Sequence, residues 1–180
     1  MGLEEIIKKN FFPDALTEQE MAGIQLDMRD CWEVTEIKSM QASNLFKALV
    51  ALLPEDSIFC LETTNPVEEV TAFLEANKLS PVTKVQLGTM WPKPAVYHIP
   101  LNEQTMQQMA ELAVSFVMPE ICDHIHIYKD GEVLLEWFDA FWQPLYVSRK
   151  ITEDSVKSFC EKIGCDYCNG SLASWPGAGN

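Results

Sequence analysis

The spacing of apolar residues divides the chain into helical and extended stretches. Apolar side chains that recur at every third or fourth position share one face of a helix. Each stretch with this spacing begins at a capping residue or ends before a proline or glycine. These stretches predict helices over residues 3–12, 17–32, 42–53, 66–77, 102–118 and 152–163. In the second of them, Met21, Ile24 and Met28 form an apolar stripe behind a capping box that begins at Thr17.

Other stretches are short apolar runs or alternate between apolar and polar residues, as strands do. They predict strands over residues 57–62, 82–87 and 95–99 and three more between residues 122 and 150. The central order of these elements, βαββαβ, is that of a ferredoxin-like sandwich. We therefore predict an α+β fold: a mostly antiparallel sheet of about six strands, with helices packed on one face and an N-terminal helical extension.

The chain is predicted to form one domain. Residues 1–164 hold the predicted elements, and the helices within residues 1–54 are expected to pack on the sheet. Residues 165–180 are rich in glycine, serine, proline and asparagine, so we expect them to form a flexible C-terminal tail.

The clearest turn signal is Asp130-Gly131, which lies between two β-rich runs and predicts a two-residue hairpin. A regular hairpin about this turn sets Lys129 opposite Glu132, His126 opposite Leu135 and His124 opposite Trp137. Alternation then assigns one face to the following residues: Cys122, His124, His126, Tyr128, Val133, Leu135, Trp137 and Asp139. The other face receives Ile125, Ile127, Leu134 and Phe138, with Glu136 among them.

Neither face of this hairpin is cleanly polar, so both sides of the sheet are expected to be covered. The aliphatic face is expected to pack on helices. The face with His124 and Trp137 is expected to line a groove, a ligand pocket or a subunit contact.

The net charge of the chain indicates which classes of partner it is suited to bind. The net charge of −14 disfavours nucleic acid, whose binding requires clustered lysine and arginine. An acidic surface favours a basic partner or serves solubility alone.

No apolar run reaches the roughly 20 residues that span a bilayer, so we expect no membrane contact and a soluble, cytoplasmic protein. The six cysteines are expected to be free thiols in that compartment.

Metal binding is one interpretation of the hairpin. Cys122, His124 and His126 alternate along one strand, and His-x-His can present two imidazoles to zinc. Asp139 and His98 are further potential ligands. We favour the alternative, a half-buried structural histidine pair, and therefore predict no metal and no cofactor.

Catalytic patterns are weak. Cys165-x2-Cys168 follows the end of a helix, whereas redox pairs of this form precede one. Glu136 and Asp139 flank aromatic residues, which can raise the pKa of a carboxyl, but an edge position or an ion pair is the commoner outcome. No glycine-rich phosphate loop or nucleophile elbow is present in the sequence. We therefore consider an enzyme less favoured than a binding protein.

Aromatic residues concentrate between residues 137 and 146, and Trp91 lies in a proline-rich loop. Such clusters either close a core or bind a partner. Our first hypothesis is a non-enzymatic interaction module for a basic protein or a like subunit, as in inhibitors and immunity proteins. The alternative is a small-molecule-binding domain or enzyme, with its pocket on the His124/Trp137 face. Both hypotheses use the same candidate binding residues: His124, His126, Tyr128, Trp137, Asp139, Trp142, His98 and Trp91.

Overall fold

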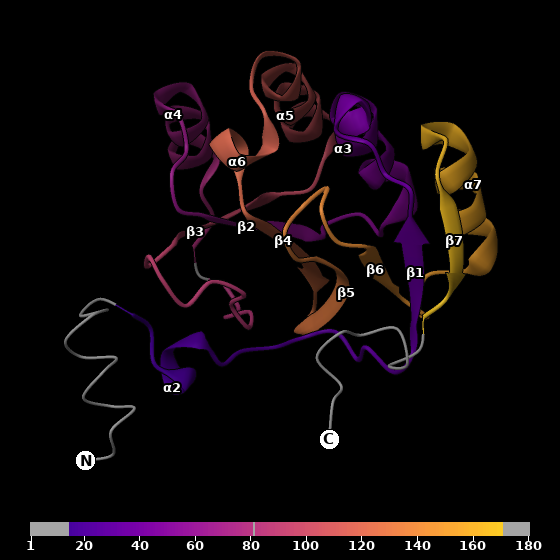
Figure 1. Ribbon diagram of the computed structural model, residues 1–180, viewed down its shortest axis with the longest axis horizontal. Coiled ribbons are helices and arrows are strands. Elements are labelled where there is room, and N and C mark those ends of the chain that lie inside the picture. The colour runs from indigo at the N-terminus through magenta and orange to yellow at the C-terminus, as the bar shows by residue number, and fades with distance from the viewer. Residues whose placement is uncertain (1–14, 81, 171–180) are drawn as a thin grey trace.

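The computed structural model describes residues 15–80 and 82–170. Its centre is a seven-stranded antiparallel sheet with the strand order β3-β2-β4-β5-β6-β1-β7 (Figure 1). The strands are β1 (Cys31–Thr35), β2 (Ile58–Thr63), β3 (Ala95–Pro100), β4 (His124–Lys129), β5 (Glu132–Trp137), β6 (Leu145–Ser148) and β7 (Asp166–Asn169). The predicted helix over residues 3–12 lies outside the described residues.

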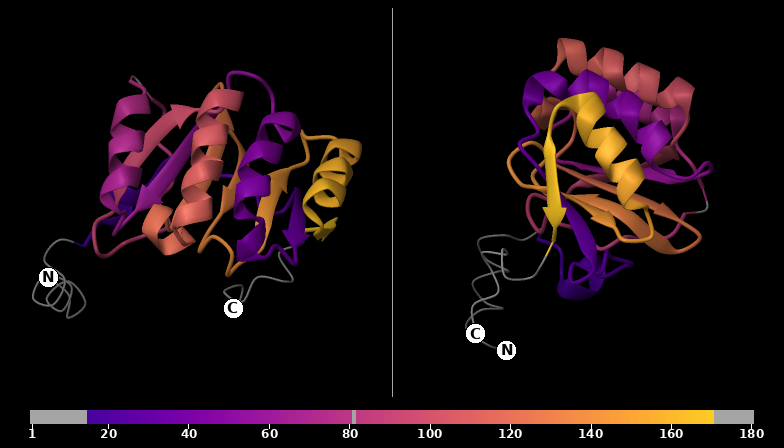
Figure 2. Two further views of the ribbon diagram at one scale, coloured as in Figure 1. Left: turned by 90° about the horizontal axis from the view of Figure 1, so that it is seen from above. Right: turned by 90° about the vertical axis from the view of Figure 1, so that its right-hand side faces the viewer.

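Helices cover one face of this sheet. The described helices are α2 (Glu18–Met21), α3 (Ala42–Leu52), α4 (Glu68–Asn77), α5 (Glu103–Ser115), α6 (Met118–Ile121) and α7 (Glu153–Ile163), with a 3-10 turn, η1 (Ser39–Gln41), before α3. Figures 1 and 2 show α3, α4, α5 and α7 side by side over the sheet. The α+β class and the antiparallel sheet are therefore confirmed, with one more strand than predicted.

Local signals explain where several helices begin and end. Asn102 caps α5 by accepting a hydrogen bond from the Thr105 backbone N–H, and Thr152 caps α7 in the same way through the Ser155 N–H. Gly164 ends α7 with a left-handed backbone, φ 71°, which glycine adopts without steric cost. The apolar faces of these helices meet the sheet in one continuous core, which includes Phe46, Met106, Met109, Leu61 and Ile127.

The prediction for residues 17–32 is wrong. Only one helical turn forms after the Thr17 capping box, and the chain then runs extended into β1. The apolar spacing was misleading because these side chains pack over one face of the sheet and do not form the apolar stripe of a helix. Ile24 forms a parallel bridge with Val85, so two irregular segments pair below the sheet.

The predicted strand at residues 82–87 is also missing, apart from that bridge at Val85. Three of the four strands of the expected ferredoxin-like core pair as β4-β2-β3, but the fourth is this missing strand. The ferredoxin-like core is therefore not confirmed. In place of an edge strand, the connection between α4 and β3 lies below the sheet (Figure 1).

The C-terminal boundary differs from the prediction. Residues Asp166–Asn169 form β7, which pairs with β1, so the expected flexible tail does not begin at residue 165. Residues 171–180 lie outside the described part of the chain.

The predicted register of the hairpin is wrong beyond its turn. Lys129 does pair with Glu132, but a β-bulge follows, and Leu134 is an extra residue opposite the Ile127/Tyr128 step. A shift of one residue moves the rest of a strand to the opposite face. Glu136 consequently pairs with His126, and Trp137 pairs with Ile125 on the helix-covered face.

Candidate functional site

A pocket of about 1000 Å³ lies on the sheet face opposite the helices. Its outer walls are residues 15–28 and 86–91, the two irregular segments that run below the sheet, and its inner wall is formed by β4, β5 and β6 with the loop after β5. The lining residues are Ala15, Gln25, Leu26, Met28, Gln86, Leu87, Gly88, Thr89, Met90, Trp91, His124, Glu136, Phe138, Asp139, Gln143 and Tyr146.

Polar and ionisable side chains cross the whole sheet behind this pocket in a single row. Residues that are directly paired in neighbouring strands point to the same face. Following the pairs from β3 to β7 gives His98, Cys60, His126, Glu136, Tyr146, Glu33 and Cys168. The helix-covered face is therefore apolar, and the polar and ionisable side chains lie on the pocket face.

Three members of this face form a buried Glu–His–Glu network. His126 Nε2 lies 2.7 Å from Glu62 Oε1, and His126 Nδ1 lies 3.5 Å from Glu136 Oε1. The side chains of Glu62 and His126 are fully buried, and that of Glu136 is 2% exposed. The first contact is a short hydrogen bond, whereas the second is an ion pair too long for a strong one.

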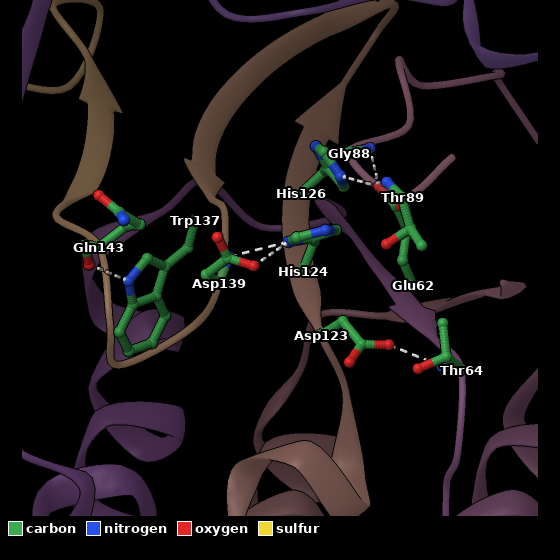
Figure 3. A network of polar contacts seen from close by, with 10 residues as sticks. All are labelled: Glu62, Thr64, Gly88, Thr89, Asp123, His124, His126, Trp137, Asp139 and Gln143. Carbon is green, nitrogen blue, oxygen red and sulfur yellow. Dashed lines mark hydrogen bonds and ion pairs between the residues drawn. The ribbon is translucent and has the colours of Figure 1, made fainter. Parts of the chain in front are cut away.

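Glu62 also holds the loop that forms the outer wall. Its two carboxylate oxygens accept hydrogen bonds from the backbone N–H groups of Gly88 and Thr89, at 2.8 and 3.1 Å (Figure 3). The loop approaches the sheet closely here: a Cβ on Gly88 would lie 2.7 Å from His124 Cδ2 and 2.8 Å from Phe138 Cδ1. Glycine at this position lets the loop backbone reach Glu62.

Contacts within the network shift the pKa values of its members. Burial by itself would lower the pKa of His126, but the contacts with Glu136 and Glu62 outweigh burial and raise its pKa to about 8. Burial likewise opposes the charged form of Glu62, yet the hydrogen bonds from His126 and the Gly88 backbone keep its pKa below the ordinary value. Near neutral pH the network therefore contains a charged imidazole and an ionised Glu62.

His124 lines the pocket in a defined tautomer. The Asp139 backbone N–H donates a hydrogen bond to His124 Nδ1 at 2.8 Å, so that nitrogen carries a lone pair and the ring proton is on Nε2 (Figure 3). Asp139 has φ 45°, a left-handed conformation that aspartate tolerates better than most residues. Trp137 Nε1 donates to the Gln143 carbonyl at 2.8 Å and holds the far side of the same loop.

A second histidine cluster lies beside the network. Tyr128 Oη accepts a hydrogen bond from the Thr83 N–H at 3.2 Å and is hydrogen-bonded to His98 Nδ1 at 3.0 Å. His98 Nε2 is 3.7 Å from Cys60 Sγ. Burial, with a smaller contribution from the charge of His126, lowers the pKa of His98 to about 4, so His98 is neutral.

The structure brings together only some of the residues expected at the site. His124, Asp139 and Trp91 line the pocket. His126, Tyr128 and His98 are buried behind its wall on the same face. Trp137 belongs instead to the helix-side core, and Trp142 is 83% exposed and does not line the pocket. His124 and Trp137 therefore do not share one face of the sheet as expected, because the bulge in β5 puts their side chains on opposite faces.

The proposed metal ligands do not converge. Cys122 lies in the helix-side core, where burial raises the pKa of its thiol, while His124 and His126 lie on the pocket face. Within residues 15–80 and 82–170, no group of three histidine, cysteine, aspartate or glutamate side chains is placed to hold a metal ion.

Sequence reasoning missed Glu62 and Gly88. Glu62 is the one acid in the apolar run of residues 58–62, and a charge inside a strand that is otherwise buried was the available signal. Gly88 gave no comparable signal, because its close contact with the sheet depends on a strand 36 residues further along the chain.

No protein-family model, curated protein or solved structure matches this chain. Among the described residues, no helix is long and apolar enough to cross a membrane.

Proposed function

We propose that this protein binds a small organic molecule in the pocket between the sheet and its two covering segments. The observation that carries the proposal is the pocket itself: a cavity of about 1000 Å³ with ionisable groups on one wall and apolar residues on the others. Ligand sites in proteins are concave, largely apolar and contain a few fixed polar groups.

The apolar walls suit the body of such a ligand. Leu26, Leu87, Met90 and Phe138 line the pocket from both covering segments and from the end of β5. Met90 and the neighbouring Trp91 are 38% and 52% exposed, although large apolar side chains usually bury more of their surface. A ligand in the pocket would remove this surface from water, which stabilises the complex.

The polar wall is held in place before any ligand arrives. Glu136 is on a central strand beside His126, and the hydrogen bond from Asp139 orients the His124 ring. Groups held rigidly lose little entropy when a ligand binds, so they contribute affinity and selectivity.

The proposal predicts that filling the pocket abolishes binding. N-phenyl-1-naphthylamine, an uncharged dye whose fluorescence rises in apolar sites, is expected to bind the wild-type protein. Met28 lines the pocket, so Met28→Trp should occupy part of its volume and weaken dye binding by about tenfold or more. Fluorescence titration of both proteins measures this difference.

Met40→Trp is the matched control, because Met40 is 86% exposed and does not line the pocket. This variant should bind the dye as the wild type does. No saturable dye binding by the wild-type protein, or equal loss in both variants, would contradict the proposed function.

A protein partner is the second candidate function. It is favoured by Trp142, which is 83% exposed in the loop between β5 and β6, and by the net charge of −14. Exposed tryptophan residues often form the centre of an interface, and acidic surfaces attract basic partners. A like subunit or a basic protein would use this surface next to the pocket, since Gln143 lines the pocket itself.

A further inference from the structure

We propose that the ligand of this pocket is an organic cation, a primary or secondary ammonium group attached to an apolar body. This inference rests on the proposed function and adds the chemical class of the ligand.

The first argument is the charge of the pocket wall. Among the described residues that line it, Glu136 and Asp139 are the acids, and none is a lysine or an arginine. His124 Nδ1 accepts a hydrogen bond from the Asp139 backbone N–H and is therefore not a donor toward the pocket. A carboxylate or phosphate ligand would therefore lie beside acidic side chains and lose its hydration without gaining a lysine or arginine partner from the lining.

The second argument is the balance of charge inside the buried network. Glu62 and Glu136 are two carboxylates, and His126 is the one cation between them. The hydrogen bond of His126 Nε2 is made with Glu62, which also accepts two backbone N–H groups of the covering loop. Two acidic side chains thus share one imidazole, and the backbone donors of the covering loop are bonded to Glu62.

The third argument is the missing donor at Glu136. Its Oε1 is buried and faces His126 Nδ1 at 3.5 Å, and among the described residues neither of these two atoms has a hydrogen-bond partner. A buried carboxylate oxygen without a donor is costly, and the cost is relieved when a donor arrives. Glu136 lines the pocket, so an ammonium group bound there would add a cation beside a carboxyl group that is not fully hydrogen-bonded.

The rest of the pocket suits a cation with an apolar body. Phe138, Tyr146 and Trp91 line it, and aromatic rings attract cations through their π faces. The side chains of Leu26 and Leu87 add aliphatic surface. A ligand with its ammonium group next to Glu136 and its apolar body against the covering segments would match both the acidic and the apolar wall of the pocket.

The test compares three probes of the same size that differ in charge: 4-phenylbutylamine, 4-phenylbutanol and 4-phenylbutyrate. Each competes with N-phenyl-1-naphthylamine for the wild-type protein at pH 7, so displacement of the dye reports its affinity. The amine is expected to bind about tenfold more tightly than the alcohol, because only the ammonium group adds its own positive charge to a hydrogen bond with the acidic wall. The acid is expected to bind more weakly than either.

Glu136→Gln should bring the affinities of the amine and the alcohol to within about threefold of each other. Glu161→Gln is the matched control, because it removes one exposed acid from α7 on the other face of the sheet. That control should keep the full preference for the amine.

The outcomes separate the two proposals. Dye binding without any preference for the amine, or a preference unchanged in Glu136→Gln, would overturn the cation inference and leave the pocket function standing. Failure of the wild type to bind the dye or any of the three probes would overturn both. The wild-type comparison needs no variant to fold, so it decides the cation inference by itself.

Discussion

At the scale of single residues, the unusual feature is a histidine buried between two glutamates. Glu62, His126 and Glu136 are each at most 2% exposed. Moving charges out of water costs several kcal/mol per ion, and pairing recovers only part of that cost. Such a network is therefore a poor way to stabilise a fold, whereas perturbed ionisable groups beside a cavity are typical of functional sites.

The network predicts a stability that falls as pH rises above neutrality. The pKa of His126 is raised from 6.5 to about 8, so its contribution is complete below pH 6.5 and is lost as pH rises through 8. The loss is on the order of 2 kcal/mol, because each pKa unit corresponds to about 1.4 kcal/mol. Urea unfolding of the wild type between pH 6 and about 8.5 measures it.

His126→Gln should abolish this decline, since the titrating group is gone. His98→Gln is the matched control, another buried histidine on the same sheet face. The pKa of His98 is lowered to about 4, so its contribution is present above pH 6.5 and is lost only as pH falls toward 4. An alkaline decline that persists in His126→Gln, or one that vanishes in His98→Gln, would contradict the assignment.

At the scale of elements, two irregular segments take the place that a second layer of helices would have. The segment before β1 and the connection between α4 and β3 touch through the Ile24–Val85 bridge, with backbone hydrogen bonds from Ile24 N to Lys84 O and from Gln86 N to Ile24 O. Glu62 then anchors the connection to the sheet. Further backbone hydrogen bonds join Leu16 N to Met90 O and Leu87 N to Met21 O, but the pairing of the two segments is irregular, so the outer wall of the pocket is expected to open more readily than the sheet.

Gly23 is the position at which this wall is most sensitive. A Cβ there would lie 2.2 Å from the Val85 carbonyl carbon and 2.4 Å from its oxygen, and backbone atoms cannot move aside as a flexible side chain can. Gly23→Ala should therefore force the two segments apart and destabilise the protein by about 1–3 kcal/mol. Hydrogen exchange is the more specific measurement: the amides of residues 84–89 should exchange faster, while those of β2 and β4 keep their relative protection.

Ala22→Ser serves as the control for Gly23→Ala, because the neighbouring Ala22 is exposed and tolerates a small change. Unchanged exchange at residues 84–89 in Gly23→Ala would show that this contact does not hold the wall. The same variant should also bind N-phenyl-1-naphthylamine less tightly, since the pocket lies directly behind the wall.

At the scale of the whole molecule, the two faces of one sheet have different roles. Helices seal the first face into an apolar core, and the second face holds a row of ionisable residues beneath a looser cover. The exposed Trp142 lies at the edge of this second face, in the loop that also contributes Gln143 to the pocket. A partner bound there would lie next to the pocket and cover an apolar side chain that water now surrounds.

Among the possible partners at this surface, a second copy of the chain is the easiest to test. Sedimentation velocity should show a mass that rises from monomer toward dimer with protein concentration, because burial of Trp142 against a second copy removes apolar surface from water. Trp142→Ser should remain monomeric over the same range. Trp91→Ser, at the pocket and not in this loop, should associate as the wild type does; identical monomeric masses for all three proteins would rule this interface out.

The order of elements was largely predictable, because periodicity and capping are local properties. The helices α3, α4, α5 and α7 and the strands β2 to β6 form close to where apolar spacing places them, whereas α6 was not predicted, and Asp130-Gly131 does turn a hairpin. The failures arise from contacts with distant segments: residues 17–32 have helical spacing but run mostly extended, and Asp166–Asn169 forms a strand where composition suggested a tail. In both cases pairing with a distant strand outweighed local preference.

The sequence by itself determined that this protein is an α+β chain with a histidine-rich central hairpin and an acidic surface. Only the tertiary structure decided which residues share the pocket. The bulge at Leu134 moved Glu136 to the side of His126 and sent Trp137 into the core, and no spacing in the sequence marks that extra residue. Glu62 meets His126 across 64 positions of chain. Such contacts depend on strand register, which the packing of whole faces decides after the local elements have formed.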